Sequence, residues 1–279
     1  MNTIALIALA PAGGMAQTPP FADAAAVETI AELVVETPPP APLFFGVAHV
    51  IVPPGTIAET AGTAGPRIIA IDSGTLTIAT DGTATVLRAT AYTPQPLESV
   101  PLNSEIVLGP GDRFLASESA IRHIRNEGTR PSVYLDTALF PPGPGSISPA
   151  FTTREGISFQ LLAGVIAETV PDAPLQVTLS RMRLPANGAL PTSPRDGPAL
   201  IYVEAGSLGL EAVGGAIHYS RSAAPTPSST AGPMRPVRIG DNLNLAAGAS
   251  AYLELGSSIL ASNQRDVPVT LLMVELGPA

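Results

Sequence analysis

The sequence predicts an all-β protein made of two tandem antiparallel β-barrels or sandwiches. Short runs rich in Val, Ile and Thr alternate with turns along most of the chain, which contains 31 Pro and 26 Gly. Helical periodicity is almost absent. The block 53–78 also recurs at 185–210 with a constant offset of 132 positions, which indicates a duplicated unit. The matching turn residues are Pro53 and Pro185, Gly65 and Gly197, Pro66 and Pro198, and Gly74 and Gly206.

Composition limits the class of protein. The 279 residues are enough for one large or two ordinary domains, and 45% hydrophobic content with no Trp predicts a core of Val, Leu, Ile and Ala. The net charge of −9, without clustered basic residues, argues against nucleic-acid binding. The absence of Cys excludes disulfides, thiolate metal sites and Cys nucleophiles.

The N-terminal 43 residues precede the β-rich part. The apolar run Ile4–Ala10 is too short to span a bilayer, which needs about 20 residues. It resembles a signal-peptide core without a positively charged leader, so we expect residues 1–17 to be a signal peptide and the protein to be secreted or extracytoplasmic. We interpret residues 18–43 as a Pro- and Ala-rich tether with a short helical stretch at Ala24–Val35.

The first β-rich unit is expected at residues 44–140. Asp81-Gly82 is a two-residue hairpin signal. A looser stretch, Thr93–Ser104, separates the unit's two groups of strands. The expected strands are Val47–Val52, Arg67–Ile71, Thr75–Ala79, Thr83–Leu87, Glu105–Leu108, Arg113–Ala116, Ala120–Ile124 and Ser132–Leu139.

The second β-rich unit is expected at residues 151–279. The Pro- and Gly-rich residues 141–150 form the predicted linker before it. A polar insertion, Ser222–Pro236, interrupts the unit. Its expected strands are Gln176–Leu184, Leu200–Val203, Ser207–Ala212, Asn242–Leu245, Ser250–Leu255, Ile259–Ser262 and Pro268–Leu276.

These features together resemble the cupin family. Cupins carry a first motif, PG-(x)5-H-x-H-(x)3-E-(x)6-G, and a second, P-x-G followed by H-(x)3-N. The frame of the first motif stands in both repeats, and the second motif is visible at Leu108–Gly128 and, more eroded, at Leu245–Asn263. Asn126 and Asn263 end the two copies. The sequence is therefore similar to a two-domain cupin, or bicupin, over roughly residues 44–277, which implies two tandem cupin-type (jelly-roll) β-barrels.

The resemblance also implies where a metal site would lie. In the family, each barrel holds its metal with two His, one Glu and a third His. The corresponding positions are Ala61, Thr63, Arg67 and Arg122 in the first repeat and Ser193, Arg195, Ala199 and Ile259 in the second. None of these eight residues is a His or a carboxylate. Metal ligation needs imidazole nitrogens or carboxylate oxygens that converge on one point. We therefore expect both metal sites to be degenerate, with no bound metal and no cofactor.

The three histidines do not restore a ligand set. His123 neighbours a ligand position, but adjacent strand residues face opposite sides of a sheet. If Arg122 points inward, His123 points outward. His49 precedes the first motif, and His218 follows that of the second repeat. We interpret all three as scattered surface or edge residues.

Two groups of residues are candidates for ligand binding. If Arg67 and Arg122 face one cavity, two guanidinium groups would suit a small anion. The alternative is that carboxylates such as Glu59 or Glu118 pair with them, or that they reach solvent. In the second repeat, Arg195, Ser193 and Tyr202 could form a pocket for a sugar or another small polar ligand; an exposed Arg195-Asp196 turn is the alternative.

No catalytic residues are predicted. The sequence has no G-x-S-x-G elbow, no phosphate-binding loop and no G-x-G-x-x-G. We expect a non-catalytic secreted bicupin that binds a small polar or anionic ligand or acts as a structural or interaction protein. The alternatives are a metal-dependent dioxygenase- or isomerase-like cupin enzyme with a non-standard site, and an accessory subunit of an extracytoplasmic assembly. The chain is not expected to span a membrane, and a homodimer or larger assembly is a family-level expectation.

Overall fold

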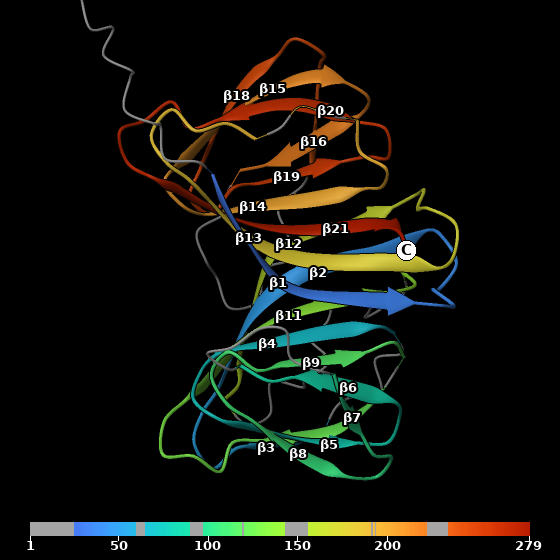
Figure 1. Cartoon of the computed structure of the whole chain (residues 1–279). Coiled ribbons are helices and arrows are strands. Elements are labelled where there is room, and N and C mark those ends of the chain that lie inside the picture. The colour runs from blue at the N-terminus through green and yellow to red at the C-terminus, as the bar shows by residue number, and fades with distance from the viewer. Residues whose placement is uncertain are drawn as a thin grey trace, which may run out of the picture.

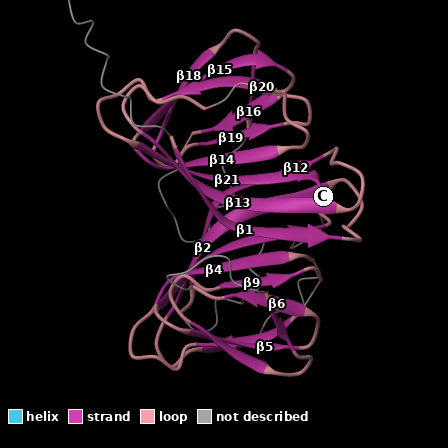
Figure 2. Ribbon diagram, in the orientation of Figure 1, coloured by secondary structure: helices cyan, strands magenta, loops and turns pink. Residues whose placement is uncertain are grey.

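Two β-barrels lie one above the other in the computed structural model (Figure 1). The structure describes residues 25–59, 65–89, 97–118, 120–142, 156–190, 192, 194–221 and 234–279. Strands are the only regular elements in these ranges, as Figure 2 shows. The expected signal peptide at 1–17 and most of the expected linker at 141–150 lie outside them.

The first barrel consists of two facing sheets. One has four strands in the order β3-β10-β5-β8, and the other has seven in the order β12-β2-β11-β4-β9-β6-β7. The strands are β2 (Leu43–Val52), β3 (Ile57–Glu59), β4 (Arg67–Ser73), β5 (Leu76–Thr80), β6 (Ala84–Leu87), β7 (Glu98–Val100), β8 (Glu105–Leu108), β9 (Arg113–Ala116), β10 (Ile121–Arg125), β11 (Ser132–Phe140) and β12 (Ser158–Ala167).

The second barrel repeats this arrangement. Its sheets have the orders β1-β13-β21-β14-β19-β16-β17 and β18-β15-β20, and Ala189 adds a single bridge to Ser262. The strands are β1 (Ala26–Val35), β13 (Leu175–Leu184), β14 (Ala199–Ala205), β15 (Ser207–Gly214), β16 (Ile217–Ser220), β17 (Arg235–Val237), β18 (Asn242–Ala246), β19 (Ser250–Leu253), β20 (Ser258–Ser262) and β21 (Val269–Pro278).

Both barrels are jelly rolls. In the first, β2, β11, β4 and β9 are neighbours in one sheet, while β3, β10, β5 and β8 form the opposite one. The chain therefore crosses between sheets at each step from β2 to β5, and returns in the reverse sense from β8 to β11. Cupins share this double Greek-key arrangement. The predicted fold of two tandem cupin-type barrels is confirmed.

The repeated Gly residues allow two segments of backbone to approach closely. A Cβ atom on Gly65 would lie 1.9 Å from the carbonyl oxygen of Leu139, and one on Gly197 would lie 1.5 Å from that of Leu276. The proline that follows each glycine accepts a hydrogen bond from the same leucine that the glycine approaches. Leu139 N–H donates to the Pro66 carbonyl and Leu276 N–H donates to the Pro198 carbonyl, both at 3.0 Å. The duplicated Gly-Pro pair is therefore required by the fold.

The repeated asparagines fix the turn before the last strand of each barrel. The side-chain nitrogen of Asn126 donates to the carbonyls of Val52 and Arg130, each at 2.8 Å. The Asn263 side chain donates in the same way to Leu184 at 3.2 Å and Val267 at 2.8 Å, and also to Pro185 at 2.9 Å. Both asparagines are 1% exposed, so these bonds satisfy buried amides. The end of the second motif has a structural role in both halves.

Each barrel takes its outer strand from the segment that precedes the other barrel. The stretch Ala24–Val35 was expected to be a short helix within the tether, but its residues Ala26–Val35 form β1 and pair with β13 of the second barrel. The expectation was wrong because long-range pairing and burial override the local helix preference of its Ala and Glu residues. Likewise β12 pairs with β2 of the first barrel. The second barrel therefore takes β1 from the predicted tether 18–43, and the first barrel takes β12 from the predicted unit 151–279.

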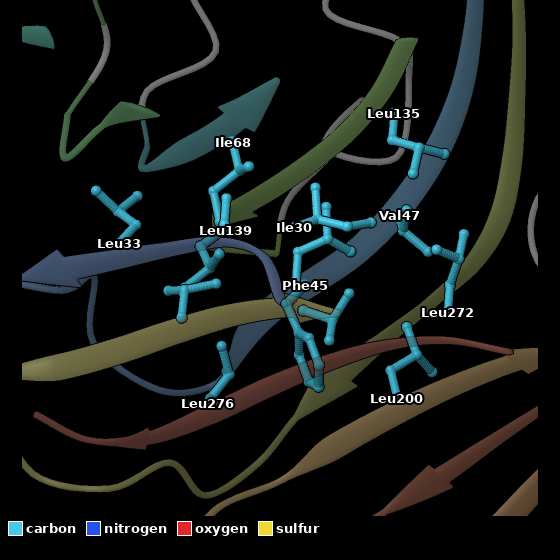
Figure 3. Packing of buried hydrophobic residues seen from close by; sticks show 14 of the residues in the cluster. Ile30, Leu33, Phe45, Val47, Ile68, Leu135, Leu139, Leu200, Leu272 and Leu276 are labelled. Carbon is cyan, nitrogen blue, oxygen red and sulfur yellow. The ribbon is translucent and has the colours of Figure 1, made fainter. Parts of the chain in front are cut away.

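The two seven-stranded sheets pack against each other through a shared apolar core (Figure 3). It joins Phe45, Ile68 and Leu135 of the first barrel to Leu200 and Leu272 of the second. The Phe45 ring also meets that of Tyr252 edge-on, with centroids 6.1 Å apart. The exchanged strands complete this core, since β1 lies across β4 and β9 and β12 lies across β14 and β19. The chain is therefore one interlocked two-barrel body.

Candidate functional site

The interior of the first barrel contains a buried ion pair. Arg67 shares its face of β4 with Ile69, which packs in the barrel core. Its Nε atom lies 3.2 Å from Oδ1 of Asp136 on β11. The two residues are 6% and 5% exposed. The expected internal carboxylate partner of Arg67 thus exists, but it is Asp136 rather than Glu59 or Glu118.

Asp136 belongs to a polar row on the inner face of β11. Ser132 and Tyr134 precede it at alternate positions, and both are fully buried. Within the described ranges, the Ser132 and Tyr134 hydroxyls make no hydrogen bond. Burial raises the pKa of Tyr134 well above its usual range, with Asp136 adding to the effect, and burial also raises the pKa of Asp136 although Arg67 opposes this. The same places in the second barrel hold the apolar residues Val269, Leu271 and Met273.

Arg122 does not share a cavity with Arg67. It is exposed on β10, whereas Ile121 and Ile124 of the same strand pack in the first-barrel core. The prediction was wrong because a register shift between Ile121 and His123 breaks the regular alternation of faces. His123 is partly buried, with Nε2 3.6 Å from a Glu105 carboxylate oxygen. An anion site built from both arginines is therefore contradicted.

The second barrel has a polar pocket at its mouth, with a volume of about 340 Å³. Arg195 forms an ion pair across it with Glu275 of β21. Glu275 lies on the same face of β21 as Met273, which packs inside the barrel. The lining residues are Gln176, Thr178, Pro194, Arg195, Asp196, Gly197, Glu275, Leu276, Gly277 and Pro278.

Tyr202, the other described residue predicted for this pocket, does not line it. Tyr202 packs against the apolar core between the barrels, and burial, with a contribution from Glu204, raises its pKa. Ala199 and Ile259 are buried in the second-barrel core. Ala61, Thr63 and Ser193 lie outside the described residues. Sequence reasoning missed Glu275, Gln176 and Thr178. The available signals were the alternation of polar and apolar residues along β13 and the single carboxylate in the mainly apolar β21.

A charged cluster caps one end of the core between the barrels. Arg181 donates two hydrogen bonds to the Glu204 carboxylate, at 2.8 and 2.9 Å, and lies 3.9 Å from Asp72 of the first barrel. Burial raises the pKa of Asp72, while Arg181 and His49 act to lower it. Asp72 and Glu204 are matched by the repeat offset, as are His49 and Arg181. This correspondence between the two repeats is the sequence feature from which the cluster could have been predicted.

These residues do not fit the metal site implied by the family resemblance. The described family positions hold two arginines engaged with carboxylates, Arg67 and Arg195, together with Arg122, Ala199 and Ile259. His218 lies 3.0 Å from Glu254 and stacks on Tyr252, which packs in the core between the barrels. Over the ranges with assigned structure, no three His, Cys, Asp or Glu side chains gather closely enough to hold a metal ion.

Comparisons with known proteins give structural likenesses alone. No protein-family model matches the sequence, and no curated protein matches it. The chain is similar to oxalate decarboxylase from Lactobacillus farciminis in its formate complex, at 10% identity and a TM-score of 0.47, over 85% of this chain and 78% of that one. It is similar to AerE from Microcystis aeruginosa, at 10% identity and a TM-score of 0.41, over 84% and 88%.

A third similar structure is the cupin 2 conserved barrel domain protein from Leptotrichia buccalis. The identity is 9% and the TM-score 0.32, with 89% of this chain and 97% of that one covered. At such scores the assignment of the fold rests on the strand order, and no activity is carried over. No helix within the described ranges has the length and apolar character needed to cross a membrane.

Proposed function

We propose that this chain is a non-catalytic, secreted two-barrel protein of the cupin type that binds a small polar ligand at the mouth of its second barrel. The observation that carries the proposal is the pocket around Arg195 and Glu275. Its volume lies at the lower end of the range of roughly 300–1,000 Å³ for small-molecule sites. Convergent charged and neutral polar groups line it, as expected for a site that orients a polar ligand.

The replaced metal ligands support a binding role over an enzymatic one. A guanidinium group repels a metal cation, and the Ala199 and Ile259 side chains offer no donor atom. An enzyme of the dioxygenase or isomerase type would therefore need ligands from other positions. The accessory-subunit alternative draws no specific support from the described surface. The secreted location rests on the N-terminal sequence, and N-terminal sequencing of protein from an extracellular fraction tests it.

A ligand screen tests the proposal. The full chain is screened by thermal shift against small polar compounds, and hits are confirmed by titration calorimetry. We expect saturable binding that is lost in Arg195→Gln and retained in Arg183→Gln, which removes an exposed arginine of the same barrel. A ligand bound equally well by wild type and Arg195→Gln would place the site elsewhere. No saturable binding across the screen would overturn the proposal.

A further inference from the structure

We propose that the pocket of the second barrel selects a small zwitterion with an ammonium group beside a carboxylate, as in a free α-amino acid. This inference rests on the proposed function, because it names the ligand class of the same pocket. It follows from the charge of the lining, the arrangement of its donors and acceptors, the lack of a stacking surface, and the way its backbone is held.

The charges in the pocket favour an ammonium group. Asp196 and Glu275 contribute two carboxylates and Arg195 one guanidinium, so the lining carries one net negative charge. A simple anion would have to compete with Glu275 for Arg195 and approach Asp196 without compensation. An ammonium group instead finds two carboxylates in the lining, the partly buried one of Glu275 and the exposed one of Asp196. Carboxylates are the strongest hydrogen-bond acceptors for an ammonium group.

Arg195 can bind the carboxylate of the zwitterion. Its contact with Glu275 uses Nη1, whereas a guanidinium carries five N–H donors in a planar fork. The remaining donors can hold a ligand carboxylate in the plane of that fork. Thr178 and Gln176, on the adjacent strand, add a hydroxyl and an amide. Opposite charges therefore lie side by side, as they do in a zwitterion.

Size and shape argue for a short ligand without a large apolar part. None of the lining residues is aromatic, so a sugar ring or an aromatic side chain has no face on which to stack. The main apolar side chains are Pro194, Leu276 and Pro278, and Leu276 packs its side chain into the core between the barrels. A ligand with a short side chain fits these limits.

The backbone around Arg195 is held before any ligand binds. Arg195 N–H donates to the Ser257 carbonyl at 3.1 Å, and the Arg195 carbonyl accepts from Gly256 N–H at 2.9 Å. On the other side, Gly197 packs against the Leu276 carbonyl so closely that a Cβ atom would clash. A segment fixed at both ends loses little conformational freedom on binding.

Titration calorimetry on the full chain with four probes tests the inference. The probes are L-alanine, ethylamine, propionate and glycerol. We expect L-alanine to bind at least about tenfold more tightly than ethylamine or propionate, because each half-ligand lacks one of the two charge-assisted contacts. Glu275→Gln and Arg195→Gln should each weaken L-alanine binding about tenfold or more, whereas the control Glu211→Gln on β15 should leave it unchanged.

Different outcomes separate this inference from the proposed function. If glycerol or propionate binds and L-alanine does not, the assignment of a zwitterionic ligand is overturned, while the proposed polar-ligand pocket is retained. Equal L-alanine affinity in wild type and Glu275→Gln would also overturn it. If no compound binds, either among these four probes or in the wider screen, both the zwitterion inference and the proposed function are overturned. Circular dichroism of each variant shows that a loss of binding is not a loss of fold.

Discussion

Removing one partner of the buried pair in the first barrel should destabilise the protein strongly. In Arg67→Met, the Asp136 carboxylate is left 5% exposed, between a buried tyrosine and the apolar barrel core, without the guanidinium whose Nε lies 3.2 Å away. An unpaired buried charge costs about 3–5 kcal/mol. Since Asp136 is buried, we expect a loss at that scale rather than the ~0.2–1 kcal/mol of an exposed pair.

The double variant Arg67→Met with Asp136→Leu is the decisive comparison. It approximates the second barrel, where the same places hold Ala199 and Met273 within an apolar core. Apolar replacement of a buried pair is often neutral, or stabilising by about 1–4 kcal/mol, so most of the single-variant loss should be recovered.

Urea unfolding followed by far-ultraviolet circular dichroism measures this, since the chain has no Trp for fluorescence. The variants should unfold at different urea concentrations, with an unchanged dependence of the unfolding free energy on urea concentration. A single-variant loss below about 1 kcal/mol, or a double variant as unstable as the sum of both singles, would refute the reasoning.

Three further outcomes follow from the described contacts. Asp112 accepts hydrogen bonds from Gly109 N–H, Ala89 N–H and Arg88; burial alone would raise its pKa, but these bonds lower it below the ordinary 3.8. The stability that the Asp112 carboxylate contributes should therefore be fully present above pH 3.8 and lost as the pH falls through the pKa of the folded state. On acid titration, Asp112→Asn should lose less stability than the wild type. Asn126→Ala and Asn263→Ala should each cost about 1–3 kcal/mol in urea unfolding, because each leaves buried carbonyls unsatisfied; a cost in only one half would contradict the shared role. Cleavage within 143–155 should leave the halves associated in size-exclusion chromatography, since β1 and β12 each pair with the other barrel; separation under native conditions would argue against the exchange.

The fold was predictable because the repeat preserves residues that backbone geometry requires. Gly65 and Gly197 lie where a Cβ atom would clash with a carbonyl, and Asn126 and Asn263 hold equivalent turns. The strand exchange was not predictable, because β1 pairs with β13, which lies far along the chain, and no local feature of either segment specifies that pairing.

The candidate site was predictable only in part. Arg195 was identified from its place in the motif, but its partner Glu275 is 80 positions away and stands in no family position. Arg122 was misplaced because a single register shift reverses which side chains of β10 face the core. Asp136 and Tyr134 lie on a strand that the motif does not include.

We propose that neither barrel holds a metal ion at the family positions. Elemental analysis by mass spectrometry tests it most directly, on full-length protein incubated with Fe, Mn, Ni, Cu and Zn salts and then desalted. The account predicts metal contents far below one ion per chain and an unfolding midpoint unaffected by the salts. One tightly held ion per chain, with a matching rise in the midpoint, would contradict it.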